Sequence, residues 1–314
     1  MGGREDLGSV EVALSDGGLS ADGRGRLPVP LTPTIGREDD PNAVARLVGD
    51  PDVRLVTLTG PGGVGKTRLA LAVAHSVQLS VLDGVGWVEL AGIAHADDVS
   101  ATISRALGLT PLPGESIGDA LCRYLASKQL LLVVDNFEHV LDAAGLIGKL
   151  NGTCPRLTVL ITSREALSLA AEHRVVLGPL PLPPVAPLTS VADLESTSGT
   201  ALFLAAARRR DSRFAVSETD PPLIAEICTR LDGLPLALEL AAGRTGLLGV
   251  RELAAGLDPA LGSLSTGVRD VAVRQRTLQA TIDWSYRLLD TGLQTTFVQF
   301  AVFAGGATPM LRGR

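Results

Sequence analysis

Short runs of aliphatic and β-branched residues alternate with helical periodicities over the first half of the chain. The apolar runs predict strands at 54–59, 85–90, 130–134, 157–162 and 174–178. The segments between them predict helices at 66–77, 97–107, 116–127 and 137–150. Because parallel strands need a crossover of this length, usually a helix, the alternation predicts an α/β domain with a parallel sheet sandwiched by helices.

The pattern changes at a proline-rich stretch, GPLPLPPVAPL, at 178–188. So many prolines suit neither helix nor strand, and we interpret the stretch as the edge of the sheet domain. Only helical periodicities follow, at 199–210, 221–231, 235–246 and 249–257. Two further helices are predicted near the end of the chain, at 274–290 and 297–306.

Composition and charge exclude some classes of function. A net charge of −6 gives no basic face for a nucleic acid backbone, although Arg208, Arg209 and Arg210 form a short basic run. We expect no nucleic acid partner and no membrane span, since no apolar stretch approaches the roughly 20 residues that a span needs. Three widely spaced cysteines and an N-terminus without an apolar core favour a soluble, cytoplasmic protein.

The sequence GPGGVGKT at 60–67 matches the phosphate-binding loop pattern G-x-x-x-x-G-K-[ST], directly after a predicted strand and at the start of a predicted helix. Glycines let the backbone curl so that its N–H groups point at phosphate oxygens, and the helix N-terminus adds a positive dipole end. The alternative, a glycine-rich turn with a chance Lys-Thr, does not explain this context. We assign phosphate binding to Gly60, Pro61, Gly62, Gly63, Val64, Gly65, Lys66, Thr67 and Arg68.

Asp135 follows the apolar strand 130–134. At such a strand end an Asp alone would more often cap a helix, but with a phosphate-binding loop upstream the better interpretation is a magnesium ligand, together with the hydroxyl of Thr67. The next residue is Asn136, which can orient water but cannot take its proton. Glu138 is the nearest other carboxylate, and the sequence does not fix where it points. We therefore expect slow hydrolysis of ATP.

At this point the sequence resembles the signal-transduction ATPases with numerous domains, in the NB-ARC branch, and more narrowly the ATPase modules of bacterial regulators of the LuxR type and the antibiotic-regulatory type. The resemblance covers about 31–308. It is carried by LTPTIGRED (31–39), RLVTLTGPGGVGKTRLALAVA (54–74), LLLVVDNFEHVLDA (130–143), LTVLITSREAL (157–167), EICTRLDGLPLALELAA (226–242) and QATIDWSYRLL (279–289).

The resemblance implies roles for residues outside the phosphate-binding loop. Ile35 and Gly36 would lie beside the adenine, with Arg37 near the ribose or phosphates. Arg164 would act as a catalytic sensor of the γ-phosphate beside Lys66 and Asp135, and Pro235 would pack on the base. Without the resemblance, simpler interpretations remain. Residues 35–38 would form a surface turn, Arg164 would form an ion pair at a helix start, and Pro235 would be a first-turn proline.

The expected organisation is a flexible N-terminal tether at 1–30, a P-loop NTPase domain at 31–180, a proline-rich linker at 181–198, an all-helical lid domain at 199–258 and an incomplete winged-helix domain at 259–314. We expect an ATP- and ADP-binding, magnesium-dependent regulatory switch. Its output would be self-association or the release of an effector, with sensor and effector domains lying outside this chain. Two alternatives are an ATPase whose turnover is itself the function and a DNA-binding regulator acting through 274–303.

Overall fold

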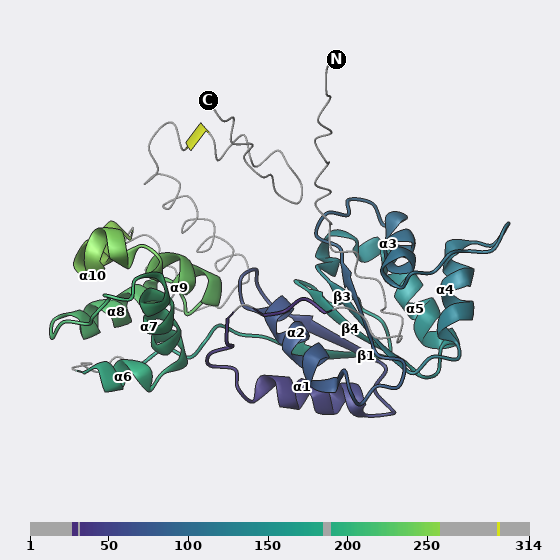
Figure 1. Cartoon of the computed structure of the whole chain (residues 1–314), viewed down its shortest axis with the longest axis horizontal. Coiled ribbons are helices and arrows are strands. Elements are labelled where there is room, and N and C mark those ends of the chain that lie inside the picture. The colour runs from purple at the N-terminus through teal and green to yellow at the C-terminus, as the bar shows by residue number, and fades with distance from the viewer. Residues whose placement is uncertain (1–26, 31, 185–189, 258–293, 296–314) are drawn as a thin grey trace, which may run out of the picture.

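A parallel five-stranded sheet forms the centre of the structure (Figure 1), a computed structural model that describes residues 27–30, 32–184, 190–257 and 294–295. Its strands are β1 (Leu55–Thr59), β2 (Val85–Glu89), β3 (Leu130–Asp135), β4 (Leu157–Ser163) and β5 (Glu172–Val176). They lie in the order β2-β3-β4-β1-β5 with every pairing parallel. The carboxyl ends of β1, β3 and β4 therefore meet at one edge, where ligands bind in open parallel sheets.

Helices cover both faces of the sheet. The helices of this domain are α1 (Asp40–Gly49), α2 (Lys66–Val77), α3 (Asp98–Ala106), α4 (Ile117–Leu125) and α5 (Ala144–Thr153), with short 3-10 turns η1 (Phe137–His139) and η2 (Leu141–Ala143). In Figure 1, α1 and α2 lie on one face, and α3, α4 and α5 lie on the other. This arrangement confirms the predicted α/β sandwich.

Side chains of β3 show how the sheet joins its two cores. Leu131 and Val133 pack toward α1 and α2, whereas Leu130, Leu132 and Val134 pack toward α3, α4 and α5. The whole strand is buried, as the unbroken apolar run requires for a central parallel strand. Each such side chain contributes roughly 1.5–3 kcal/mol when it leaves water, so the strand is firmly fixed.

An all-helical unit follows the sheet and packs beside it (Figure 1). It consists of α6 (Val191–Glu195), α7 (Ser198–Arg210), α8 (Asp220–Arg230), α9 (Pro235–Ala242) and α10 (Thr245–Gly256), the last kinked at Gly249. Its apolar side chains, such as Phe203 and Leu238, belong to the same continuous core as Val56 and Leu58 of β1. The helical unit is thus joined to one face of the sheet by shared packing.

Backbone hydrogen bonds also hold the two units together. The N–H of Leu180, in the segment after β5, donates to the carbonyl of Gly233 at 2.9 Å, and the N–H of Gly199 donates to Pro181 at 2.9 Å. Gly233 has a φ of 64°, and a Cβ there would lie 2.5 Å from the carbonyl oxygen of Leu180. Only glycine fits this close approach without strain.

Several predicted elements differ from the structure in detail. The fifth strand lies at 172–176 rather than 174–178. The helix predicted over 137–150 is replaced by η1, η2 and α5, because Asn136 (φ 63°) and Val140 (φ −134°) depart from helical geometry. The sequence predicted one helix at 235–246 and another at 249–257. In the structure the first helix ends at Ala242, and α10 begins at Thr245 and has a kink at Gly249.

Three segments were not predicted as ordered elements. Helix α1 begins with a proline in its first turn and buries Val44 and Val48, four residues apart. Helix α6 lies inside the predicted linker and begins with a capping box of Ser190 and Asp193. Leu27, placed in the predicted tether, is buried in the core. Residues 1–26 of the tether, residues 185–189 and the predicted winged helix, apart from residues 294–295, lie outside the described residues.

The close approach at Gly233 predicts that Gly233→Ala lowers the free energy of unfolding by about 1–3 kcal/mol, since alanine there combines a positive φ with a clash. Urea unfolding followed by circular dichroism measures the change. Gly118→Ala in α4 is the control: its Cβ meets nothing nearer than Leu146 Cδ1 at 4.0 Å, so it should be neutral or stabilising. Equal losses for both variants would contradict the inferred contact.

Candidate nucleotide-binding site

The loop between β1 and α2 has the backbone that its glycines allow. Gly60, Gly63 and Gly65 have φ values of 148°, 75° and 99°, a region that other residues avoid. Lys66 begins α2, and its Nζ donates to the carbonyls of Gly60 at 2.8 Å and Pro61 at 3.1 Å. Both partners are neutral, so the loop keeps a full positive charge at a helix N-terminus, where anions bind.

Burial lowers the pKa of the Lys66 ammonium, while the negative charges of Glu138 and Asp135 oppose this effect and the positive charge of Arg164 adds to it. The side chain is buried, with 8% of its surface exposed. A buried cation with only carbonyl partners is costly until an anion approaches it. This electrostatic imbalance favours a phosphate group beside the lysine.

Asp135 connects three parts of the site. Its Oδ1 accepts a hydrogen bond from the hydroxyl of Thr67 at 2.9 Å and another from the hydroxyl of Thr162 in β4. Burial raises the pKa of its carboxyl, and the two hydroxyl donors reduce that rise. Because Thr67 lies in the first turn of α2, this pair of bonds joins the ends of β3 and β4 to the phosphate-binding loop. Carboxylate and hydroxyl oxygens are also ligands that suit magnesium.

The turn after Asp135 brings two further polar groups to the sheet edge. The backbone of Asn136 has a left-handed conformation, and its N–H donates to Thr162 Oγ1 at 3.0 Å. Glu138 forms an ion pair with Arg164, whose Nε lies 3.2 Å from Oε1. Arg164 is therefore at the end of β4, as the resemblance implied, but it binds a carboxylate of this chain.

Arg37 joins the segment before α1 to the phosphate-binding loop. Its guanidinium donates to the carbonyls of Val64 at 3.2 Å and Gly178 and pairs with Asp40 at 3.0 Å. Its Nε is buried and has no hydrogen-bond partner among the described residues. Arg37 thus holds the loop in place. The neighbouring Gly36 is in close contact with the helical unit, since a Cβ there would lie 2.3 Å from Ser198 Cβ.

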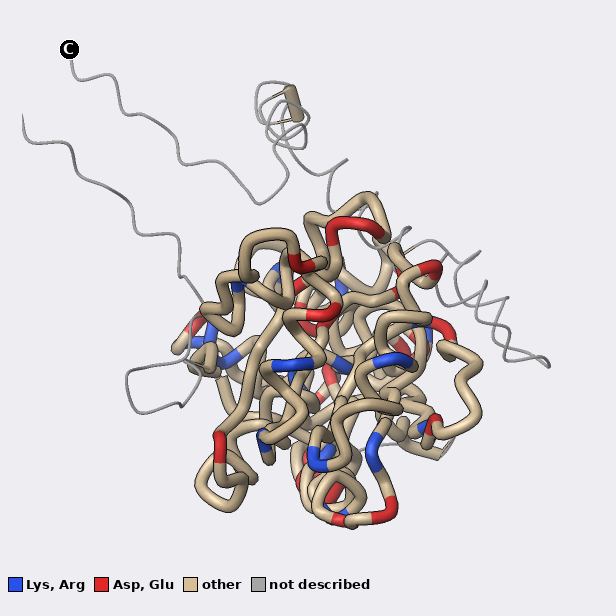
Figure 2. The backbone as a smooth tube through the Cα atoms, turned by 90° about the vertical axis from the view of Figure 1, so that its right-hand side faces the viewer, with Lys and Arg blue, Asp and Glu red and all other residues tan. Residues whose placement is uncertain are grey.

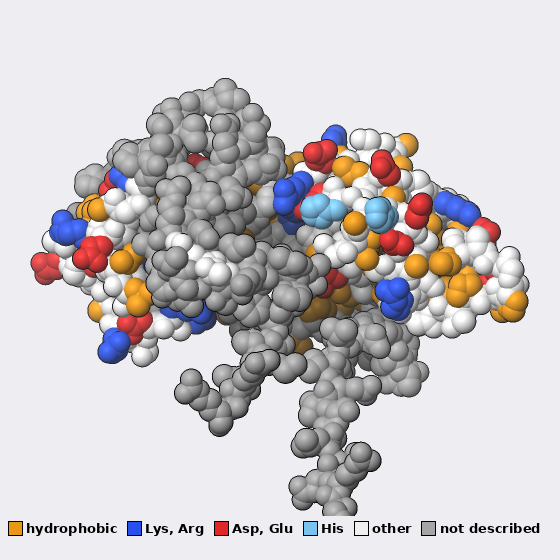
Figure 3. All heavy atoms as spheres, turned by 90° about the horizontal axis from the view of Figure 1, so that it is seen from above, with side chains coloured by type: hydrophobic (Ala, Val, Ile, Leu, Met, Phe, Trp, Pro, Cys, Tyr) orange, Lys and Arg blue, Asp and Glu red, His pale blue; other side chains and the backbone are white. Residues whose placement is uncertain are grey.

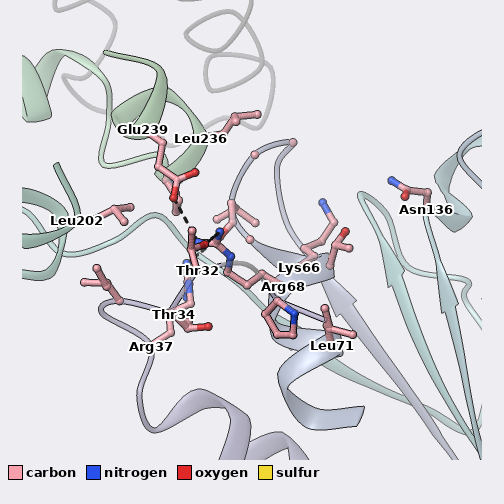
Figure 4. Close-up of a pocket in the computed structure, with 18 of the residues that line it drawn as sticks. Thr32, Thr34, Arg37, Lys66, Arg68, Leu71, Asn136, Leu202, Leu236 and Glu239 are labelled. Carbon is pink, nitrogen blue, oxygen red and sulfur yellow. Dashed lines mark hydrogen bonds and ion pairs between the residues drawn. The ribbon is translucent and has the colours of Figure 1, made fainter. Parts of the chain in front are cut away.

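The helical unit reaches the phosphate-binding loop through α9. Pro235 is at the first position of this helix, and the N–H of Leu236 donates to the carbonyl of Gly63 at 3.1 Å. Glu239, one turn later, accepts from Arg68 at 3.3 Å, and Arg68 also donates to Thr32 at 2.6 Å. Figure 4 shows Glu239 and Leu236 reaching from α9 toward the loop.

These groups surround one cavity of about 590 Å³ (Figure 4). Of the residues predicted from the sequence, the cavity is lined by Ile35, Arg37, Gly62, Gly63, Val64, Gly65, Lys66, Thr67, Arg68, Arg164 and Pro235. Gly36, Gly60, Pro61 and Asp135, also predicted, are not among its lining residues. Its size is in the range of small-molecule and cofactor sites.

Sequence reasoning missed part of the lining. Thr32, Thr34, Leu71, Leu202, Leu236 and Glu239 also face the cavity. Thr32 and Thr34 lie within the quoted LTPTIGRED motif and Leu236 follows Pro235, so neighbouring motifs could have indicated them. Leu71 and Leu202 give no such signal, because their place depends on how α2 and α7 pack. These apolar side chains suit the faces of an aromatic base.

Acidic and basic residues are interspersed over the described backbone (Figure 2). The face in Figure 3 likewise mixes both signs with histidine and apolar side chains. All three cysteines are free thiols. Every helix within 27–30, 32–184, 190–257 and 294–295 is too short or too polar to cross a bilayer.

Comparison with protein families decides the relationship. The model of the NB-ARC domain matches residues 37–174, which include the phosphate-binding loop, Asp135 and Arg164. The chain belongs to the NB-ARC family. This confirms the predicted family, and the parallel sheet described above confirms the predicted fold class.

Relatives of this NB-ARC chain include regulators. It is 43% identical over 256 residues to the protein named "Putative HTH-type transcriptional regulator Rv0890c" of Mycobacterium tuberculosis, covering 81% of this chain and 27% of that protein. It is 41% identical over 278 residues to "Uncharacterized protein Rv0894" of the same organism, covering 88% and 67%. The chain thus spans about a quarter of the length of the named regulator.

Among solved structures, the chain is similar to the STAND protein with a tetratricopeptide repeat sensor, PH0952, from Pyrococcus horikoshii. The TM-score is 0.49 at 14% identity, and the match covers 88% of this chain and 36% of that one.

The raised pKa of Asp135 predicts that Asp135→Asn makes the ligand-free protein at least as stable as wild type at neutral pH. Each unit by which burial raises the pKa above its ordinary value of 3.8 costs about 1.4 kcal/mol at neutral pH. An amide oxygen can still accept from Thr67 and Thr162. Thermal unfolding without nucleotide measures the difference.

The sign of the pH dependence follows from the direction of the shift. A carboxyl whose folded pKa is raised stabilises the fold most below pH 3.8, and this contribution is lost as pH rises through the folded pKa. The advantage of Asp135→Asn should therefore shrink on acidification. A variant that is less stable than wild type at neutral pH, with a deficit that disappears in acid, would contradict the assignment.

Proposed function

We propose that this NB-ARC chain is an ATP- and ADP-dependent regulatory switch that hydrolyses ATP slowly. The observation that carries the proposal is the hydrogen bond from Leu236 in the helical unit to Gly63 in the phosphate-binding loop. A nucleotide in the cavity would contact both units at once. A change in its phosphate end would therefore alter the restraint on the helical unit, which is what a switch requires.

Residues of the cavity divide by chemistry. The backbone of the loop and the Lys66 ammonium would bind the phosphates, and Arg164 would respond to the γ-phosphate. The apolar side chains of Ile35, Leu202 and Pro235 would pack around the base. Arg37, which also lines the cavity, would place its positive charge near the nucleotide.

Magnesium suits the oxygen atoms at the end of β3. Asp135 is a buried carboxylate within hydrogen-bond distance of the Thr67 hydroxyl, and its raised pKa reflects a charge that burial leaves undercompensated. These two side chains would hold the ion beside the phosphates. When bound, magnesium neutralises negative charge on the phosphates. Loss of the Asp135 carboxylate should thus weaken the magnesium dependence of binding.

Regulation is the role that the relatives favour. The matching stretch of the Mycobacterium tuberculosis protein lies within a chain named as a transcriptional regulator. We propose that the nucleotide state of this module controls self-association or the release of an effector region. The interspersed acidic and basic positions along the described backbone (Figure 2) and the net charge of −6 of the whole sequence give no support to direct DNA binding.

Lys66→Ala should abolish or strongly weaken binding of ATP and ADP with magnesium. The ammonium would contribute charge-assisted hydrogen bonds worth about 1.5–3 kcal/mol, or about 10- to 150-fold in affinity. Calorimetric titration measures the change. Lys149→Ala is the matched control, because this exposed lysine pairs with Asp119 away from the cavity. Equal affinities of wild type and Lys66→Ala would overturn the proposed site.

A further inference from the structure

The side chain of Glu138 is placed by its neighbours in the turn after β3. Phe137 is fully buried and anchors η1 in the core beside β4. On the other side, the left-handed Asn136 is fixed by its bond to Thr162. These two constraints direct Glu138 into the cavity, which it lines together with Lys66 and Arg164.

One oxygen of Glu138 is paired and the other is not. The side chain is only 8% exposed, and Oε1 accepts from Arg164. Oε2 is buried without a hydrogen-bond partner among the described residues. A buried carboxylate oxygen normally has a partner, because leaving it unpaired costs free energy. An unpaired carboxylate oxygen on a side chain that lines a ligand cavity can accept a proton or a hydrogen bond once the side chain turns toward a ligand.

Glu138 also acts on Lys66. Among the charges that influence the lysine pKa, that of Glu138 has the largest effect, ahead of Arg164 and Asp135. The carboxylate therefore lies near the group that would hold the terminal phosphates. Asn136, although it lines the same cavity, has an amide that cannot accept a proton from water. Asp135 Oδ1 already accepts from two hydroxyl donors, and this carboxylate is the one that would hold magnesium.

We propose that Glu138 is the catalytic base of ATP hydrolysis and that Arg164 restrains it before ATP binds, an inference that rests on the proposed function. The oxygen of water forms a bond to the γ-phosphorus, and the bond from that phosphorus to the bridging oxygen breaks. The bridging electron pair stays on ADP. The proton of the water goes to Oε2 of Glu138 and then to solvent, leaving inorganic phosphate.

Arg164 provides the restraint through the same ion pair. Its side chain is 42% exposed, so it is freer to move than Glu138. The γ-phosphate draws the guanidinium away from Oε1, and the carboxylate is then released toward water. The γ-phosphate and Glu138 compete for the same guanidinium of Arg164. The Glu138 carboxylate is therefore free for only part of the time, which keeps turnover slow.

Glu138→Gln is the decisive variant, since the amide keeps the size and removes the base. It should bind ATP with magnesium within about threefold of wild type and hydrolyse it about 100-fold or more slowly, the usual contribution of a general base. Calorimetry with a non-hydrolysable ATP analogue and single-turnover hydrolysis measure the two quantities. Nucleotide extracted from the purified variant after incubation with ATP should be ATP, whereas wild type should yield ADP.

Glu165→Gln is the matched control, because Glu165 is an exposed acid that follows the neighbouring strand β4 and does not line the cavity, so this change should leave both quantities unchanged. If Glu138→Gln is poorly folded, Glu138→Ala replaces it, with analogue binding as the proof of folding. A hydrolysis rate within threefold of wild type, in a variant that binds the analogue, would overturn the role of Glu138 but not the proposed function. A wild type that binds but never hydrolyses ATP would overturn the role of Glu138 and the slow hydrolysis, but not the nucleotide site. A wild type that binds no nucleotide would overturn the proposed function as a whole.

Discussion

The carboxylate of Asp135 is the interaction on which the geometry of the site depends. It lies at the end of the fully buried β3 and accepts hydroxyl donors from Thr67 and Thr162. One oxygen therefore holds the start of α2 and the end of β4 against β3. Because β4 separates β1 from β3 in the sheet, this contact fixes the distance between the phosphate-binding loop and the turn that carries Glu138. The free energy that burial of the charge costs is offset by the packing of the strands around it.

A second constraint links this edge of the sheet to the helical unit. The apolar core runs continuously from β1 to α7 and α9, and α9 donates a backbone hydrogen bond to the loop itself. The ion pair of Arg68 with Glu239 adds a polar contact between the same elements. The cavity therefore has walls from both units, and neither unit alone would form it.

Much of this arrangement could be predicted from the sequence because it depends on local patterns. The apolar run before Asp135 and the glycines before Lys66 specify a strand and a loop with few alternatives. Helix α1 was missed, although a proline in its first turn and two valines four residues apart are local signals. The contacts of Arg37 with the protein itself could not be predicted, since its hydrogen bond to Gly178 spans 141 residues of sequence.

The direction in which the Glu138 side chain points could not be predicted either. It depends on the left-handed Asn136, on the burial of Phe137 and on Arg164, which is 26 residues away in the chain. A helical periodicity over 137–150 suggested a regular helix, whereas tertiary contacts impose two 3-10 turns before α5. Contacts between distant residues decide such details, and the pattern of a single sequence does not record them.

Hydrogen–deuterium exchange with and without magnesium and ADP tests most directly the claim that one nucleotide restrains both units. Amides of the loop at 60–67 and of the start of α9 at 236–239 should become protected together, because the N–H of Leu236 is bonded to Gly63. Lys66→Ala should lose both effects. Protection confined to 60–67, with exchange in α9 unchanged, would contradict the account.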